Sequence, residues 1–508
     1  MRRMRVVAAV LVLGVLALAA YLFARAVLGT DLVRSAVEAQ LAARLGQPVR
    51  IASAGASIFP RLALDLRDVS IGAPAVVQLG HARIVTGLRG LFSRTIADAE
   101  VVVSDGRIVL PAAFALVPAA AAPEARGAAP SAAFTVTSIA GISLRNVDLI
   151  AGERSLRVDL DSSVHGDRLD IRSLTARAKT TRLDASGALS SLTRFEGRLD
   201  AKTDRLDLDE MISTGAAMVP PDVKGEHPQR TAAGTPVHLT INLTAASGQF
   251  ASYVFRELST TADLVPGRIL LTPLSVRAFG GRFDGRLNVA TGGNVPELLL
   301  AGRVDALDVA DVMKANGSPG GVTGRLRGSL RLTADGSNAQ AVMRTTHGTI
   351  DAAITDGTMP RLDMVRTIVL AFGKPSGAPP AGSGSSFSRL GGMFALTGGT
   401  LTSDNVALSS RDFDMHGRTT VRLGTGEVNA RADVVLSEEL TAQSGTDLRR
   451  YAQQDGRVVV PATIGGTLDH PTVSLDVAAA TQRAIENELK RRASSWLDGL
   501  FKKKKGGG

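Results

Sequence analysis

The 508-residue chain contains no cysteine, which excludes disulfide frameworks, cysteine-ligated metal centres and thiol nucleophiles. Aromatic residues make up only 4% of the chain, with a single Trp, so stacking platforms for nucleic-acid bases are scarce. Hydrophobic residues make up 44%, too much for a disordered protein and enough for a sizeable core. The length allows several domains.

Recognisable catalytic signatures are also missing. No H-E-x-x-H, G-x-S-x-G, P-loop or G-x-G-x-x-G motif occurs, and the seven histidines are scattered without the spacing of metal ligands. The acidic group Asp204, Asp207 and Asp209 lacks the Gly and Glu of a calcium-binding loop, so we interpret it as a helix N-terminus. The sequence therefore predicts a protein that is not an enzyme, with no catalytic residue, metal ligand or cofactor.

The positive charge is concentrated at the two ends of the chain. The formal net charge is +10, of which residues 1–5 contribute +3 and residues 483–508 contribute +5, next to apolar segments in both cases. A nucleic-acid-binding protein normally carries a basic stripe along its folded body, whereas the body here is almost neutral. The pattern favours membrane surfaces as partners and argues against nucleic acid.

The first segment is predicted to anchor the chain in a membrane. Residues 6–23 carry no charge and would span about 27 Å as a helix, close to the thickness of a bilayer's hydrocarbon core. Arginines before the segment place the N-terminus in the cytoplasm and the body in the bacterial periplasm, with the inner membrane as the site of anchorage. A cleaved signal peptide, cut after Ala17-Leu18-Ala19, is the alternative. The anchor residues are Val6, Leu11, Leu13, Leu16, Leu18, Tyr21 and Phe23.

The body is predicted to be mainly β, with a few helices. Residues 30–45 have helical spacing of apolar residues and end at Gly46, and from about residue 49 to 477 apolar and polar residues alternate with period two. Alternation is unbroken in 237–244, and 325–332 is a looser case with a phase slip. This pattern predicts β structure with one apolar and one polar face. The apolar residues of the clearest segments are Leu62, Leu64, Leu66, Leu239, Ile241, Leu243, Leu326 and Leu330.

Composition divides the chain into five parts. We expect an anchor in 1–28, a first β region in 29–215, a linker in 216–236, a second β region in 237–477 with a flexible insert at 373–388, and a basic helix and tail in 478–508. An internal similarity relates 195–212 to 300–317, with a weaker third copy at 359–369. In each copy an Asp-containing segment leads into apolar residues, which indicates a duplicated β unit with a short helix.

The C-terminal segment returns to helical spacing. Its apolar stripe is bordered by basic residues and followed by four lysines, a combination typical of a helix at a membrane interface. The alternative is a helix that closes the end of the β body and has a solvated tail. The candidate interface residues are Ile485, Leu489, Arg491, Arg492, Trp496, Leu500, Lys502, Lys503, Lys504 and Lys505.

Several segments resemble the AsmA family of bacterial envelope proteins. Residues 41–74 are similar to the opening of that family, in which an anchor leads to a Gly-x-Pro-Val turn, a strand, a Phe-Pro and a strand ending in D-V-S-I-G. Residues 279–289, 348–365 and 396–436 resemble later segments, as does V-P-A-T-I-G-G-T-L-D-H-P at 460–471. The resemblance implies an inner-membrane-anchored protein related to repeating β-groove lipid-transfer proteins. It also implies a long, curled antiparallel sheet whose apolar face forms a lipid groove, with the apolar strand residues given above, from Leu62 to Leu330, as candidate groove residues.

Taken together, these observations predict a non-catalytic envelope protein that binds or conducts phospholipid in an apolar β-groove between membranes and contributes to outer-membrane biogenesis. Other envelope proteins are possible partners. One alternative is an assembly factor or scaffold for outer-membrane proteins that acts through strand edges and holds no lipid. A second is an exported hydrolase, which would need a convergent Asp, Glu and His cluster. Whether the apolar face is open or filled by the protein's own side chains distinguishes the first two.

Overall fold

The computed structural model describes residues 31–57, 61–87, 95–96, 98–110, 112–113, 135–136, 138–218, 237–293, 295–317, 320–373, 375–444, 453–476, 478 and 482. The predicted anchor (1–28) lies outside these residues, as do most of the linker 216–236 and nearly all of the basic segment 478–508. Within the part that is described, no helix is both long and apolar enough to cross a membrane. Contacts divide the chain into two units, the first covering 1–254 and 261–266 and the second 255–260 and 267–508.

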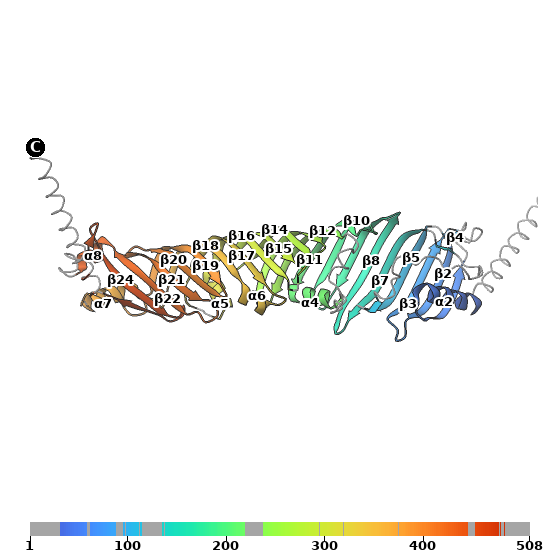
Figure 1. Ribbon diagram of the computed structural model, residues 1–508, viewed down its shortest axis with the longest axis horizontal. Coiled ribbons are helices and arrows are strands. Elements are labelled where there is room, and N and C mark those ends of the chain that lie inside the picture. Colours follow the sequence, from blue (N-terminus) through green and yellow to red (C-terminus); the bar gives the residue numbers. More distant parts are fainter. Residues whose placement is uncertain are drawn as a thin grey trace, which may run out of the picture. The chain divides into compact units, whose positions relative to one another are not determined.

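The first unit is a sheet with helices at its strand ends (Figure 1). Its main sheet has the order β1-β2-β3-β5-β7-β8-β9-β10-β11-β12, antiparallel throughout except at β5–β7 and β11–β12. Parallel neighbours need a longer connection than a hairpin, and the chain supplies one at each of these two steps. The elements are α2 (Asp31–Leu45), β1 (Val49–Ser57), β2 (Leu62–Ile71), β3 (Val77–Thr86), β4 (Thr95–Ile96), β5 (Ala99–Val109), β6 (Thr135–Val136), β7 (Ile139–Ala151), β8 (Arg154–His165), β9 (Arg168–Arg177), β10 (Arg182–Ser191), β11 (Glu196–Asp207), α4 (Leu208–Met218) and β12 (His238–Phe250).

The second unit is an antiparallel sheet in the order β14-β15-β16-β17-β18-β19-β20-β21-β22-β24-β25. β13 (Tyr253–Val265) contributes residues to both units. The other elements are β14 (Arg268–Ala278), β15 (Gly281–Ala290), β16 (Glu297–Asp308), α5 (Val309–Ala315), β17 (Arg325–Asp335), α6 (Ala339–Thr345), β18 (His347–Met359), α7 (Met364–Ala371), η3 (Pro375–Gly377), β19 (Ser385–Thr397), β20 (Thr400–Ser409), β21 (Phe413–Arg422), β22 (Val428–Leu436), α8 (Glu438–Gln443), β23 (Gln453–Gln454), β24 (Arg457–Gly466) and β25 (Pro471–Leu475).

The expectation of a mainly β protein is confirmed. Each of the two sheets is open, because no pairing among the described strands joins one edge of a unit's sheet to its other edge. The curl implied by the family resemblance is not found, and the alternating pattern itself fixes which side chains share a face but not whether the sheet rolls up. The predicted helix at 30–45 is present as α2, the segments 237–244 and 325–332 correspond to β12 and β17, and Leu62, Leu64 and Leu66 lie in β2.

Strand-to-helix junctions explain the internal similarity noted in the sequence. Asp207 ends β11 and accepts a hydrogen bond from the backbone N–H of Glu210, which caps α4. Asp308 ends β16 in the same way and accepts from the backbone N–H groups of Ala310 and Asp311, which caps α5. Carboxylates at this position satisfy amide groups that have no partner inside the helix. Asp207 and Asp308 are therefore caps. The interpretation of the acidic group as a helix N-terminus is right for Asp207 and for Asp209 in the first turn of α4, whereas Asp204 lies within β11.

Candidate functional site

Apolar side chains form continuous rows across the strands of the second unit. Leu307 of β16 lies opposite Leu326, and the row continues from strand to strand to Val460 of β24. Each step is a direct cross-strand pair, so these side chains lie on the same face of the sheet. In order, the row is Leu307, Leu326, Ile354, Leu390, Leu408, Met415, Val434 and Val460. We call this side of the sheet the apolar face.

A second row confirms that the apolar face reaches β14. Leu271 pairs with Leu287, Leu287 with Leu300, and Leu300 with Leu332. In β17 the residues Leu326, Gly328, Leu330 and Leu332 share the face, so the strand alternates without the predicted phase slip. Gly328 lies on the apolar face between Leu326 and Leu330, where its lack of a side chain interrupts the run of leucines but not the alternation.

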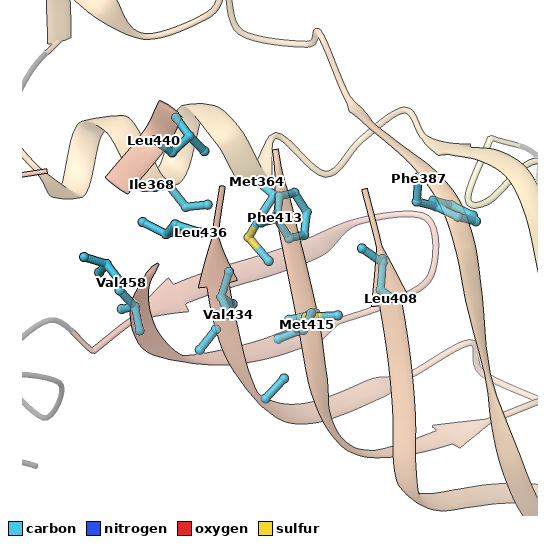
Figure 2. Packing of buried hydrophobic residues seen from close by; sticks show 14 of the residues in the cluster. Met364, Ile368, Phe387, Leu408, Phe413, Met415, Val434, Leu436, Leu440 and Val458 are labelled. Carbon is cyan, nitrogen blue, oxygen red and sulfur yellow. The ribbon is translucent and has the colours of Figure 1, made fainter. Parts of the chain in front are cut away.

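Helices cover the apolar face at the C-terminal end of the unit. Met364 and Ile368 of α7 are completely buried, and Leu440 of α8 is 5% exposed; all three pack against the sheet (Figure 2). The strand residues beneath them form a dense core, which we call the covered section: Leu408, Phe413, Met415, Ala430, Ala432, Val434, Leu436, Val458, Val460, Ala462 and Ile464. This end of the face is filled by the protein's own side chains.

Local hydrogen bonds hold α7 over the covered section. The Asp363 carboxylate accepts from the backbone N–H groups of Gly382 and Gly384, and the Ser385 hydroxyl accepts from the N–H of Met364. These contacts tie the start of α7 to the chain segment that returns into β19. They also show that the predicted insert 373–388 is held at Gly382 and Gly384 and that its last residues begin a strand.

The same face is uncovered over β14 to β17, which we call the open section. Its large apolar side chains are all partly exposed rather than buried: Ile269, Leu271, Leu274, Val276, Phe283, Leu287, Val289, Leu298, Leu300, Val304, Leu326, Leu330 and Leu332. The short helices α5 and α6 adjoin β16 and β17, each following the strand that it contacts. Apolar surface in this section therefore lacks the second layer that normally buries a sheet face.

Two glycines bring an aromatic ring flat against the open section. A Cβ added at Gly302 would lie 2.6 Å from the ring of Phe283, and one added at Gly285 would lie 2.7 Å from it. The ring therefore occupies space that any side chain at these two positions would need. The sequence analysis did not single out Phe283, although the alternation in 281–290 places it on the apolar face.

The opposite face is polar and carries ion pairs both within a strand and between neighbouring strands. Arg282 lies 2.9 Å from Asp284, and Arg327 lies 2.9 Å from Asp305. The pKa of Asp284 is below its ordinary value, mainly because the Ser275 hydroxyl donates to its carboxylate; burial opposes this and Arg282 adds to the lowering. One face of the sheet is thus suited to water and the other to apolar groups.

One end of the first unit's sheet is also covered by a helix. Val37, Leu41, Ala42 and Leu45 of α2 pack against β1, β2 and β3, with Ile51, Leu66 and Val69 buried beneath them. Further along, Leu169, Ile171 and Leu189 form a smaller cluster with Leu199 and Leu239 of the same sheet. No described helix contributes to that second cluster.

The predicted groove residues therefore separate into three groups. Leu64 and Leu66 are core residues beneath α2, and Leu62 is partly exposed beside them. Leu239, Ile241 and Leu243 are partly exposed on β12, opposite Gly197, Leu199 and the buried Ala201 of β11. Leu326 and Leu330 lie in the open section of the second unit. The predicted anchor residues and the interface residues from Ile485 to Lys505 lie outside the described residues.

Two further sources of information on function, metal-binding clusters in the described part of the chain and similar proteins, give no match. Among the described residues, no group of three or more His, Asp and Glu side chains is arranged to hold a metal ion. Comparison of the chain with protein families, with curated proteins and with solved structures finds no match. The similarity to the AsmA family thus stays a prediction from the sequence.

Proposed function

We propose that the protein binds phospholipid acyl chains on the open section of its apolar face and acts, without catalysis, in lipid transport between the membranes of a bacterial envelope. The observation that carries this proposal is the set of unbroken apolar rows over β14 to β17, whose large side chains stay partly exposed although the short helices α5 and α6 adjoin β16 and β17. A continuous exposed apolar patch marks a site of interaction with an apolar partner.

An acyl chain matches this surface because it is apolar along its whole length and makes no demand for specific hydrogen bonds. Each methylene that leaves water contributes about 0.8 kcal/mol, so about ten methylenes contribute about 8 kcal/mol before the costs of ordering. The phosphate headgroup would stay in water at the strand ends, since no described polar group points into the open section from its own face.

The covered section supports the proposal by contrast. The row that begins at Leu307 and Leu326 continues to Val434 and Val460, where helices α7 and α8 pack against it. The protein thus completes its own core at one end of the face and leaves an equivalent apolar surface open at the other. The sequence-based anchor in the inner membrane would hold this surface in the periplasm.

Site-specific photo-crosslinking of the full chain in its native membranes tests the proposal. The photoreactive residue p-benzoylphenylalanine replaces Leu330 in the open section or, as the matched control, Ser329, its neighbour on the polar face. We expect phospholipid adducts at position 330 and none at position 329, detected by mass spectrometry of the purified protein.

Two results would overturn the proposal. Adducts to outer-membrane proteins at position 330, without lipid, would favour the alternative of an assembly factor. A folded protein with no adduct at position 330 would show that the open section has no apolar partner in the cell.

A further inference from the structure

Two arginines face each other on the polar side of the covered section. Arg418 of β21 lies directly opposite Arg431 of β22, and both side chains are exposed. The Cβ atoms of directly opposed residues lie about 5 Å apart, so the two guanidinium groups can reach one another. Like charges in this arrangement repel and destabilise the pairing of the strands.

Other opposed arginines in the protein have carboxylates that balance them. Arg177 lies opposite both Arg157 and Arg182, and these three pair with Asp159, Asp148 and Asp184. Arg277 and Arg282 are also opposed, and they pair with Glu257 and Asp284. Arg418 and Arg431 differ, because neither forms an ion pair or a side-chain hydrogen bond with any other described residue.

Hydrogen-bond donors extend from this arginine pair across the neighbouring strands. Thr463 of β24 lies opposite Arg431, and Ser474 of β25 lies opposite Thr463; both are exposed. One step along the strands, Thr420 lies opposite Asn429. Four strands therefore present a row of donors that begins with two positive charges, and such a row matches the oxygen atoms of phosphate groups.

Acidic groups lie to one side of this row. His416 is opposite Asp433 two residues along each strand from the arginine pair, and Asp404 lies where β20 has a register shift against β21. Neither Arg418 nor Arg431 has an ion pair of its own with a described residue. The positive charge of the pair thus remains available to a ligand.

We propose that Arg418 and Arg431, with Thr463 and Ser474, bind phosphate groups at the surface of an anionic phospholipid bilayer. The site is fully open, and a single phosphate ion held at an exposed site gains little against water. A bilayer presents many phosphates at once, and each basic residue near an anionic surface adds to the attraction. This inference does not depend on acyl-chain binding by the apolar face.

The test uses the full chain held in nanodiscs of neutral phosphatidylcholine, so that its anchor is satisfied. Binding is measured to immobilised vesicles of phosphatidylcholine, with or without phosphatidylglycerol. The double variant R418Q/R431Q should lose on the order of 30-fold in affinity for the vesicles with phosphatidylglycerol, and show no change with neutral vesicles. The matched control R177Q/R182Q removes the same charge from an opposed pair that carboxylates already balance, and we expect it to bind like the unmodified chain.

Each other outcome would overturn the inference. Equal losses in the two double variants would show that only the total charge matters. Unchanged binding of R418Q/R431Q, with its thermal unfolding preserved, would show that the pair does not contact the bilayer. Displacement by millimolar inorganic phosphate, without a preference for phosphatidylglycerol, would assign the site to the free ion.

Discussion

The contrast between the covered and open sections predicts very different costs for the same substitution. Leu408 and Leu326 lie in one cross-strand row, but Leu408 is 1% exposed beneath α7, whereas Leu326 is partly exposed in the open section. Replacing a fully buried leucine by alanine removes transferred apolar surface and leaves a cavity, at a cost of about 3 to 5 kcal/mol. Leu326→Ala leaves no enclosed cavity, so it should cost about 1 kcal/mol from the lost transfer of part of one side chain.

Native-state hydrogen exchange with mass spectrometry measures this difference within the second unit. A gap of about 2 kcal/mol or more corresponds to at least about a 30-fold difference in the opening equilibrium of amides in β19 to β24. Leu423→Ala serves as the control, because Leu423 is 51% exposed in the turn after β21 and should change little. If Leu326→Ala costs as much as Leu408→Ala, the open section is covered, and both the contrast and the basis for lipid binding are refuted.

Two further predictions concern positions where local geometry decides the outcome. Gly302→Ala should destabilise the second unit by roughly 1 to 3 kcal/mol in chemical denaturation, because its Cβ would lie 2.6 Å from the Asp284 carbonyl oxygen and from the Phe283 ring. Gly55→Ala, where a Cβ meets no atom within 4 Å, should change stability by no more than about 0.5 kcal/mol, and equal effects would contradict the clash. Burial raises the pKa of Glu210, but hydrogen bonds from Thr180 and Thr181 outweigh it, and the net pKa lies below the ordinary value. The Glu210 carboxylate therefore stabilises the folded protein fully at pH values above its pKa in the unfolded chain. This stability is lost as the pH falls through its lower pKa in the folded protein. Acid should thus loosen α4 from the turn at 178–181. Glu210→Gln should remove that pH dependence and lower the stability by about 1 kcal/mol at neutral pH. Hydrogen exchange of the α4 amides as a function of pH measures this. The same pH profile in the variant and the unmodified protein would refute the role of Glu210.

Sequence periodicity is enough to assign side chains to a face but not to decide what covers that face. Leu64 and Leu66 show the same alternation as Leu326 and Leu330, yet α2 packs over the first pair and no described helix packs over the second. Coverage depends on where the chain returns after a strand, which is a non-local property. In the case of α7 it depends on the contacts of Asp363 and Ser385 with residues about 20 positions apart along the chain.

The opposed arginines show a second limit of sequence reasoning. Arg418 and Arg431 lie 13 positions apart in the sequence, on the neighbouring strands β21 and β22. Only the register of these two strands places the arginines opposite each other. A shift of register by one residue would turn one of them toward the core instead. Local patterns in the sequence are therefore enough to predict the apolar face and the Asp207 cap. They do not predict the opposed arginines, which depend on how neighbouring strands pair.

The open section also has consequences for stability that follow from its single layer. A sheet face normally gains its stability from a second layer, and exposed ion pairs such as Arg327–Asp305 contribute little individually. β14 to β17 are therefore held mainly by their backbone pairing and by continuity with β18 to β24, whose covered core supplies the packing. In the absence of lipid these strands should be the least protected of the unit against hydrogen exchange. A bound acyl chain would act as the missing second layer and raise protection there, while leaving the amides beneath α7 and α8 unchanged.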